Sequence, residues 1–369
     1  MHTNSYRPQP VKRIWIPKDD GQQRPIGITT LEDKIVQQAL VWVLETIYEN
    51  DFRGFSYGFR PGLNQHRALD AVYMAITAKK VSWVLDADIQ KFFDSIDHDW
   101  LLLFLEHRIS DPKVLRLIKL TLTAGVVDQG CKSRTVVGTP QGAVISPLLG
   151  NICLHYVLDL WVEQWRKRYA RGEVYVVRYA DDTVFCFQYK ADGERFQRAL
   201  NERLASFKLT LNQAKTQLIE FGRFAESNRK ERGERKPQTF DFLGFTHICS
   251  HRRSDGGFKL LRKTIAKRQR RKLNEIRAVL KKSYHKRPAV VGRWLKVVVQ
   301  GYFNYYAVPG NIQVLDGFRT AVIRLWIKAM RRRSQRGSSV PWRKFVRLIN
   351  WFIPKARAIH PYPNQRLCV

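Results

Sequence analysis

Two adjacent carboxylates, Asp181 and Asp182, lie between two short apolar segments and are the residues best suited to chemistry in this sequence. The flanking segments 174–178 and 183–187 are rich in β-branched and aromatic residues, which favours two strands joined by a tight turn. Such a turn needs only one Asp, and neighbouring acids repel. The pair becomes favourable around a hard divalent cation, because Mg²⁺ prefers carboxylate and phosphate oxygens. Taken alone, a solvated Asp-Asp loop is the simpler interpretation.

A second acidic position lies in segment 81–89, which is predicted to be a buried strand. Asp86 and Asp88 share one face of that strand, because side chains alternate between faces. Charges in an apolar strand are costly unless they are paired or bind metal. A strand-borne Asp opposite an Asp-Asp turn suits two-metal phosphoryl transfer, in which one ion activates the attacking hydroxyl and the other steadies the leaving group. Asp88 is preferred because it lies nearer the strand end.

Composition limits the partners and the setting. The 369 residues, 44% of them hydrophobic, are enough for two or three folded domains. The formal net charge of +33 indicates a polyanionic partner. No apolar run approaches the roughly 18–20 residues of a spanning helix, and no signal-peptide pattern opens the chain. Five isolated cysteines suggest neither a zinc site nor a disulfide framework, so we expect a reducing, cytoplasmic setting.

Hydrophobic spacing predicts the elements that position the acids. The helix over 31–48 is inferred from an apolar stripe of Ile35, Ala39, Trp42 and Val43. The order from 81 to 221 is β-α-β-β-α-β, a split ferredoxin-like sheet with its acids on one edge. The predicted elements are a hairpin over 11–30, a helix over 31–48, a strand over 81–89, a helix from Asp97, a long helix from an N-cap at Ser146 to Arg168, a hairpin over 174–187, a helix from Asp192 and a strand over 216–221.

The composition changes after Phe221. Residues 222–237 are charged and are predicted to be an exposed loop. Segment 251–290 holds 15 Lys/Arg and two acids, and the spacing of Ile265, Leu273, Ile276 and Leu280 predicts a helix with a basic outer face. We expect Lys267, Arg270 and Arg271 on that face to contact nucleic acid, although a solvated helix is the alternative. Residues 291–307 are a second helix candidate, and 331–347 hold seven Lys/Arg without an acid.

Taken in order, the motifs of this chain resemble those of bacterial group II intron reverse transcriptases, over nearly the whole length. The matching blocks are Arg24–Ile28, Leu31–Leu40, Ser56–Gly62, Asp88–Asp97, Gly138–Leu149, Tyr179–Asp182, Leu211–Thr216 and Phe242–Phe245. The resemblance implies an α+β right-hand polymerase with a ferredoxin-like, antiparallel palm sheet and an α-helical thumb or maturase domain. The implied domains are fingers over 1–80, palm over 81–245 with inserted finger helices at about 98–140, and thumb over 246–369.

The resemblance also implies roles for single residues. Phe93 would block the ribose 2′-hydroxyl, Gln141 would read the sugar and base, and Lys215 would protonate pyrophosphate, although core packing for Phe93 and a surface position for Lys215 are the alternatives. Two Mg²⁺ ions, with Mn²⁺ as a substitute, would be held at Asp88, Ile89, Asp181 and Asp182. The other implied contacts are Lys18 and Arg24 with the triphosphate, Ile89 and Arg60 with nucleotide or template, and Phe242, Leu243, Gly244 and Phe245 as the primer grip, where core packing explains the rings equally well.

The expected function is RNA-directed DNA synthesis from an RNA template, a DNA primer and dNTPs, together with binding of group II intron RNA to assist splicing. A non-catalytic intron-RNA-binding splicing factor and a reverse transcriptase recruited to phage defence or CRISPR adaptation are the alternatives. Relative to the family pattern, this sequence has Ala143 for Gly and Gly150 for Ala. We also expect an N-terminal segment shorter than is usual before Tyr6. No Cys/His-rich endonuclease module follows the thumb, so target-strand cleavage is not expected.

Overall fold

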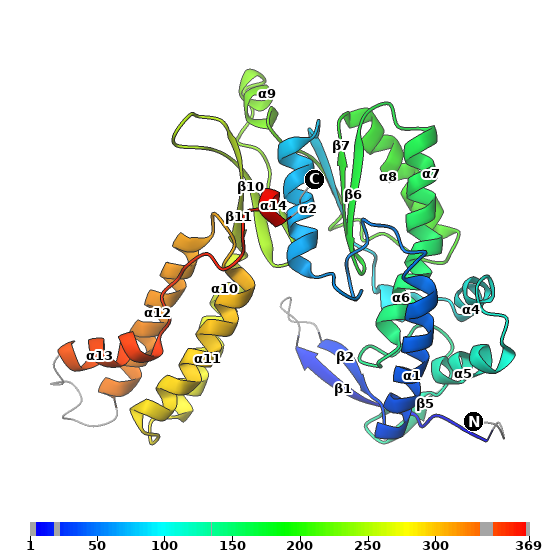
Figure 1. Ribbon diagram of the computed structural model, residues 1–369, viewed down its shortest axis with the longest axis horizontal. Coiled ribbons are helices and arrows are strands. Elements are labelled where there is room, and N and C mark those ends of the chain that lie inside the picture. Colours follow the sequence, from blue (N-terminus) through cyan, green and yellow to red (C-terminus); the bar gives the residue numbers. More distant parts are fainter. Residues whose placement is uncertain (1–4, 18–22, 134, 333–341, 367–369) are drawn as a thin grey trace. The chain divides into compact units, whose positions relative to one another are not determined.

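The chain divides into two compact units, Met1–Lys236 and Pro237–Val369 (Figure 1). The structure, a computed structural model, describes residues 5–17, 23–133, 135–332 and 342–366. The predicted palm–thumb boundary lies after residue 245, whereas the first compact unit ends at Lys236. The reason is that the strand Phe240–Phe242 pairs with strands that follow it and not with the palm sheet.

Unit 1 contains the expected hairpins and helices, with several short elements added. Its elements are β1 Val11–Pro17, β2 Gln23–Ile28, α1 Leu31–Tyr48, α2 Gln65–Ala78, β3 Trp83–Ala87, α3 Phe92–Ser95, α4 His98–Glu106, α5 Pro112–Leu122, β4 Val126–Asp128, β5 Cys131–Ser133, α6 Ser146–Leu154, the π-helical turn η1 His155–Asp159, α7 Leu160–Arg168, β6 Val174–Tyr179, β7 Asp182–Phe187, α8 Lys190–Ala205, β8 Gln217–Glu220 and α9 Ala225–Glu231.

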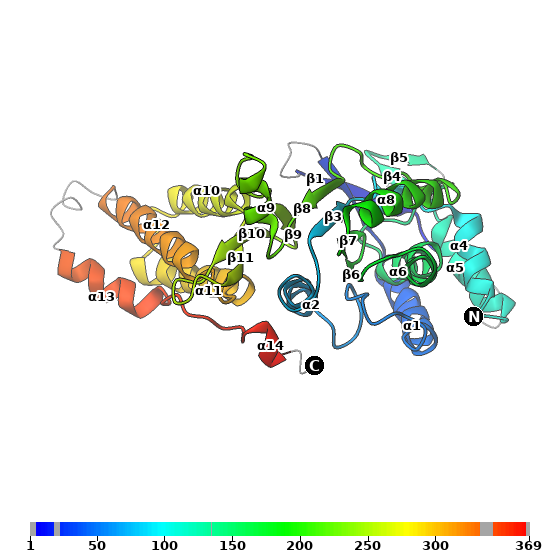
Figure 2. The same cartoon turned by 90° about the horizontal axis from the view of Figure 1, so that it is seen from above.

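The palm sheet has the strand order β6-β7-β3-β8, and all neighbouring strands are antiparallel. This confirms the predicted β-α-β-β-α-β arrangement. Helix α8 packs on β3 and β7 (Figure 2), where Phe196 lies 4.6 Å from Phe185 between ring centroids. Tyr179 pairs with Asp182, and Ala87 pairs with Thr183. The β6–β7 turn and the end of β3 therefore lie at the same edge of the sheet.

The second sheet of unit 1 has the order β2-β1-β4-β5, and its β1–β2 pair is the predicted hairpin. Helix α1 follows it as predicted, but the predicted apolar stripe is wrong. Ile35 and Trp42 are 64% and 65% exposed, whereas the face carrying Asp33 and Gln37 is buried. These two polar side chains are hydrogen-bonded, by the Tyr6 hydroxyl at 2.5 Å and by Val144 N at 2.9 Å. The buried face also carries Leu40, Val41 and Leu44, which were not part of the predicted stripe.

Two further predictions in unit 1 need correction. The long helix to Arg168 is interrupted by η1, and Ser146 is its first residue and not its N-cap. The Ser146 hydroxyl instead donates to Pro140 O at 2.9 Å. The segment 222–237 is not a plain loop, because α9 forms within it. Its apolar contact is Ala225, which is buried although the charged residues around it are largely exposed.

Unit 2 combines a small sheet with a helical core. Its elements are β9 Phe240–Phe242, β10 Phe245–His251, β11 Phe258–Thr264, α10 Ala266–Lys282, α11 Pro288–Tyr306, α12 Ile312–Arg331, α13 Trp342–Phe352 and α14 Pro363–Arg366. The β10–β11 hairpin corrects the expectation of a purely helical region after residue 245. In α10, Ile276 and Leu280 are buried as predicted, while Ile265 precedes the helix. No described helix in either unit has the length and hydrophobicity needed to cross a membrane.

Candidate active site

The β6–β7 turn presents Asp181 at the edge of the palm sheet. Tyr179 pairs with Asp182, so Ala180 and Asp181 form a two-residue turn, and Ala180 adopts a φ of +56°. A non-glycine residue in the left-handed region is strained, and such strain persists only where surrounding structure imposes it. Here the segment before Arg60 packs on the turn. A side chain at Gly58 would place its Cβ 2.3 Å from Ala180 N, so only glycine allows this close approach.

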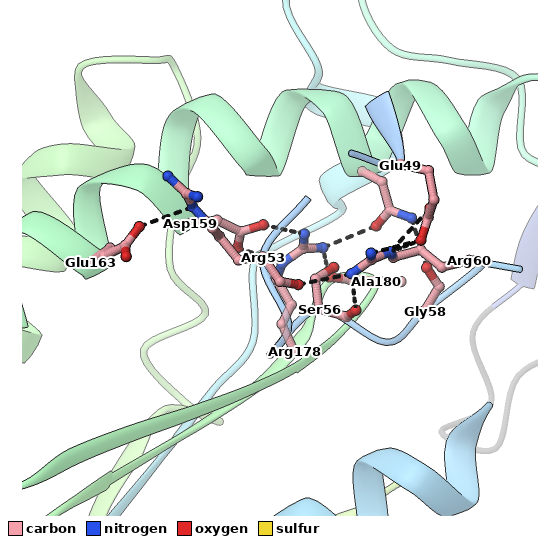
Figure 3. Close-up of polar contacts among 10 residues, drawn as sticks. Glu49, Arg53, Ser56, Gly58, Arg60, Asp159, Glu163, Arg178 and Ala180 are labelled. Atoms are coloured by element: carbon pink, nitrogen blue, oxygen red, sulfur yellow. Dashed lines mark hydrogen bonds and ion pairs between the residues drawn. The ribbon is translucent and has the colours of Figure 1, made fainter. Parts of the chain in front are cut away.

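Beneath the turn lies a buried ion pair (Figure 3). Arg178 is fully buried and donates two hydrogen bonds to Asp159, at 2.8 and 2.5 Å. A third bond from its guanidinium reaches Asn151 Oδ1 at 3.0 Å, and a fourth reaches Ala180 O at 3.1 Å. Asn151 in turn donates to Gly58 O at 2.7 Å. The network therefore satisfies the buried charges and ties the strained turn to the helix behind it.

The helix that supplies Asp159 contains a π-helical turn that was not predicted from the sequence. Asp159 closes the π-helical turn η1 and is fully buried, and Asn151 lies one element earlier in α6. π-Helical turns are rare and frequently occur at functional sites. The usable sequence signal was an Arg at the end of an otherwise apolar strand, because such a charge requires a buried partner. Periodicity could not identify that partner.

Asp88 follows β3 and is held on one side by two residues of the segment before β8. Asn212 Nδ2 donates to Asp88 Oδ2 at 3.0 Å, and Lys215 Nζ lies 3.2 Å from the same oxygen. The main chain adds a third link, because Asn212 N donates to Asp88 O at 2.8 Å. Asn212 was not predicted as a site residue. The structure thus brings Lys215 to Asp88, which sequence spacing alone could not show.

The electrostatics of Asp181 connect the turn to Asp88. Burial raises the pKa of Asp181 above its ordinary value, and the nearby charge of Asp88 raises it further. Arg24 of β2 and Arg178 oppose this rise. Asp88, Asp181 and Arg24 are therefore near one another, although they come from three separate elements. The two arginines lower the pKa of Asp181, but it remains above its ordinary value. The Asp88–Asp181 pair therefore suits a further cation.

The described residues contain no cluster of three His, Cys, Asp or Glu side chains arranged to hold a metal ion. Asp88 follows β3 and Asp181 lies in the β6–β7 turn at the same edge of the sheet, whereas Asp182 is exposed at the start of β7. The Ile89 side chain is buried and apolar, so its main-chain carbonyl is the only oxygen that it could offer. Asp88 and Asp181, with the raised pKa of Asp181, suit a divalent cation, and Asp182 is the next residue in the chain.

Phe93 and Gln141, both predicted nucleotide contacts, lie in unit 1 near residues of the first hairpin or of α6. The Phe93 ring is partly buried and packs edge-on against Phe92, with 5.2 Å between centroids. A Cβ at Gly150 would lie 2.9 Å from the Phe93 ring. Gln141 Nε2 donates to Asp94 at 3.2 Å, and the Gln141 carbonyl accepts from Gly27 N at 2.6 Å. A cavity of about 290 Å³ opens beside these last contacts, lined among others by Gly27, Asp94 and Gln141.

Arg60 does not fit its predicted role. Its side chain is only 9% exposed and donates to both oxygens of Glu49, at 3.0 and 3.2 Å from Nε (Figure 3). Its Nη1 also donates to the carbonyls of Arg53 and Ser56. These bonds occupy the guanidinium in holding the loop before Gly58, so we do not assign it to nucleotide binding. Lys18, predicted beside Arg24, lies outside the described residues.

The segment predicted as the primer grip belongs to unit 2. Phe242 and Phe245 are buried, and Phe245 stacks on Tyr305 with 6.1 Å between centroids, so both rings serve the core of that unit. Leu243 O accepts from the Tyr305 hydroxyl at 2.9 Å. Gly244 has a φ of +85° and would bring a Cβ to 2.8 Å from Arg268. Any nucleic-acid contact in this segment therefore falls to the main chain of the turn.

The cations predicted on α10 are exposed but not equivalent. The described ion pairs of α10 do not include Lys267 or Arg270, and both side chains are exposed. Arg271 is paired with Glu275 at 3.1 Å, one turn further along the helix. Lys272 contacts the same carboxylate, also at 3.1 Å. Arg271 is therefore partly neutralised within the protein, and Lys267 and Arg270 are the stronger candidates for RNA contact.

The antiparallel palm sheet, with carboxylates at the edge formed by the β6–β7 turn and the end of β3, defines a right-hand polymerase fold. A family model described as reverse transcriptase (RNA-dependent DNA polymerase) matches residues 16–247. The chain belongs to this reverse transcriptase family, as the motifs in the sequence predicted.

Individual relatives agree with this assignment. Protein YkfC of Escherichia coli (strain K12) is 35% identical over 243 residues, which cover 58% of this chain and 64% of the relative. The group II intron-encoded protein LtrA of Lactococcus lactis subsp. cremoris is 40% identical over 172 residues, 46% of this chain and 28% of LtrA. The chain thus spans less than two thirds of the length of these relatives.

A solved structure supports the fold independently. Telomerase from Candida albicans, determined with a TWJ fragment of telomeric RNA, superposes with a TM-score of 0.52. The superposition covers 94% of this chain and 62% of the telomerase chain, at 12% sequence identity. At that identity the likeness concerns the fold alone, and it agrees with the predicted α+β polymerase.

Proposed function

We propose that this protein is an RNA-directed DNA polymerase that extends a DNA primer on an RNA template from dNTPs. The observation that carries the proposal is the placement of Asp88 and Asp181 at the same edge of the palm sheet, with the pKa of Asp181 raised by burial and by the charge of Asp88. Family membership supports the same reaction. A pure RNA-binding module has no need of two acids that oppose each other in this way.

The residues take distinct roles in the proposed site. Asp88, Asp181, Asp182 and the main-chain carbonyl of Ile89 would hold two Mg²⁺ ions, with Mn²⁺ as a substitute. When bound, such ions supply charge stabilisation to the transferring phosphoryl group and acidify the attacking hydroxyl. Lys215 and Asn212 orient Asp88, and the Lys215 ammonium is a suitable donor of a proton to the leaving pyrophosphate.

Other residues of unit 1 would bind and select the nucleotide. Arg24 is close enough to Asp181 to affect its pKa, so it suits the triphosphate beside the carboxylates, together with Lys18. Phe93 would exclude the ribose 2′-hydroxyl, and Gln141 would contact the sugar and base. We also propose that the 242–245 turn contacts the primer through its main chain.

Binding of group II intron RNA to assist splicing is the second part of the proposal. Two features support it: the name of the relative LtrA and the excess of cations after residue 251. Lys267 and Arg270, with a smaller share from Arg271, would contact RNA phosphates. A non-catalytic splicing factor would share this binding but not the polymerase reaction.

Primer extension on an RNA template tests the proposed reaction. Asp88→Asn should lower the rate by about 100-fold or more, because a metal clamp contributes several kcal/mol to transition-state stabilisation. Asp99→Asn, a change at an exposed carboxylate in the first turn of α4, is the matched control and should extend at the parent rate. A near-parent rate for Asp88→Asn would refute the site. Absence of extension by the parent with either Mg²⁺ or Mn²⁺ would favour the non-catalytic alternative.

A further inference from the structure

A basic pocket of about 340 Å³ lies within unit 2, between α10 and α12. We call it the α10–α12 pocket. Its rim carries Arg277 and Lys281 on α10 and Lys328 and Arg332 at the end of α12. The two residues of each pair are four positions apart in sequence, so their side chains lie on the same face of the helix, one turn apart. Two rows of cations therefore face each other across the opening.

No acid lines this pocket in the described part of the chain. The described contacts of Arg277 include only an amide, Asn274 Oδ1 at 3.4 Å. Glu275, the nearest acid along α10, is held by Arg271 and Lys272. After Asp316 the sequence contains no Asp or Glu at all. Four gathered cations without internal compensation repel one another, and a bound polyanion would relieve that repulsion.

The inside of the pocket is apolar and not charged. Leu280 is buried, Leu325 and Ala329 are partly buried, and together they form the floor. Tyr284 lines one side and is partly buried, so its ring is available to a ligand in the pocket. The pocket thus has a charged rim, an apolar floor and an aromatic wall. The wall and floor suit the flat base of a nucleotide, and the rim suits the phosphates that flank it. A simple phosphate would use only the rim.

We propose that the α10–α12 pocket binds an unpaired nucleotide of a structured RNA, with the base against Tyr284 and the flanking phosphates on the four rim cations. A base can enter only where it is free of a duplex, so the pocket would distinguish loops and bulges from continuous helices. The inference rests on the proposed function in one respect, namely that the RNA bound in the pocket is the group II intron RNA proposed above. It requires no catalysis, and its rim cations Arg277 and Lys281 lie further along α10 than Lys267, Arg270 and Arg271.

Two probes of equal length test the proposal, a hairpin RNA with a single-stranded loop and a blunt RNA duplex. Binding is measured over a salt series with the full chain. Lys281→Gln combined with Lys328→Gln should flatten the log–log salt slope for the hairpin by roughly 1.4–1.8, since each neutralised phosphate contributes about 0.7–0.9. The matched control combines Lys355→Gln with Arg357→Gln, two exposed cations elsewhere in unit 2, and should leave the slope near that of the parent.

The aromatic wall is tested separately. Tyr284→Leu should weaken hairpin binding about fivefold or more, because loss of base stacking removes at least about 1 kcal/mol. It should leave duplex binding and the salt slope unchanged, and Tyr284→Phe should bind like the parent. Circular dichroism confirms that each variant is folded. If the Lys281/Lys328 variant matches its control, or if Tyr284→Leu weakens both probes equally, the proposal is overturned.

These results are independent of the polymerase reaction. RNA binding is read without dNTPs, so the pocket can fail while Asp88-dependent extension succeeds. Conversely, extension can be absent while the pocket still selects unpaired nucleotides. A hairpin affinity that falls in the pocket variants by no more than in the control would assign the four cations to general electrostatic attraction.

Discussion

The two units use charge in opposite ways. In unit 1 the cations Arg178, Lys215 and Arg60 are each paired with an acid, and the pair formed by Arg178 and Asp159 is fully buried. In unit 2 most cations of α10 and α12 are exposed, and no acid lines the α10–α12 pocket in the described part of the chain. Buried pairs add little net stability but fix geometry, whereas exposed unpaired cations attract polyanions from a distance. The comparison agrees with the proposal that unit 1 positions carboxylates and unit 2 binds nucleic acid.

Each unit also buries one titratable side chain whose pKa is shifted by that burial. Burial raises the pKa of Asp181 in unit 1, so its charged form opposes folding at neutral pH. Burial lowers the pKa of His247 in unit 2 to about 3, so its neutral form is the folded one. A carboxylate that opposes folding is useful if a cation binds it. His247 instead stacks on Phe240 with 4.6 Å between centroids, a core contact.

The largest expected effect concerns the buried pair in unit 1. Arg178→Met leaves Asp159 charged and buried, which should lower the free energy of unfolding by about 3–5 kcal/mol. Combining it with Asp159→Leu should restore most of that loss, because no unpaired charge remains. The double variant should still extend primers poorly, because Ala180 O loses its hydrogen bond and the turn its support. Urea denaturation and primer extension measure the two effects.

The control for this prediction is an exposed pair. Arg108→Met removes the partner of Asp51 in a pair that is largely accessible to water, so a change below about 1 kcal/mol is expected. Parent-level extension by the stable Arg178/Asp159 double variant would contradict the positioning role. The network would then be a structural element only, and the contrast between the units would weaken.

A smaller effect is expected from His247 in unit 2. Its folded pKa lies below the unfolded value of about 6.5, so protons bind preferentially to the unfolded chain. Stability is therefore complete above the unfolded pKa and falls as pH drops towards 3. Between pH 7.5 and 5 the loss should be about 2 kcal/mol. Arg262, which also lowers the pKa of His247, remains charged throughout this range.

His247→Leu should remove this part of the pH dependence. The measurement is urea denaturation of the full chain at pH 7.5 and at pH 5. His285→Gln, a change at an exposed histidine in the same unit, is the control and should keep the parent's dependence. An unchanged pH dependence in His247→Leu would mean that His247 is protonated without cost in the folded state. Main-chain contacts at Phe240 and Phe245 raise the pKa of His247, but burial and the charge of Arg262 outweigh them, which argues for the predicted loss.

The smallest effect concerns nucleotide selection in unit 1. Phe93→Ala should admit ribonucleotides, lowering the deoxy-to-ribo ratio of kcat/KM by about tenfold. Gly150→Ala should alter the same ratio by a few-fold, because its Cβ would lie 2.9 Å from the Phe93 ring and force the ring to move. Ala143→Gly, at the other small-residue departure from the family pattern, is the control. An unchanged ratio in both test variants would assign Phe93 to core packing.

Much of the architecture could be predicted because its signals are local. Alternation identified both hairpins of unit 1, and helical spacing identified the helix from Asp192, which is observed as α8 with Phe196 and Leu200 buried. The acids at 88, 181 and 182 stood out because charge in apolar strands needs a partner. The face of α1 was predicted wrongly even though Leu40, Val41 and Leu44 repeat at helical spacing on its buried side. Asp33 and Gln37 share that side, and their burial depends on hydrogen bonds to residues distant in sequence.

The sequence by itself determined the family, the palm connectivity and the carboxylates at the edge of its sheet, since these follow from motifs and periodicities within short segments. Only the tertiary structure decided which groups surround those carboxylates. The Arg178–Asp159–Asn151 network, the contact of Lys215 with Asp88 and the loss of Arg60 to Glu49 all depend on chain segments that meet through folding. The α10–α12 pocket likewise requires two helices to pack together, Ala266–Lys282 and Ile312–Arg331, which are separated in sequence by residues 283–311. Periodicity shows which face of an element is apolar, but the partner of a buried charge is set by packing between elements.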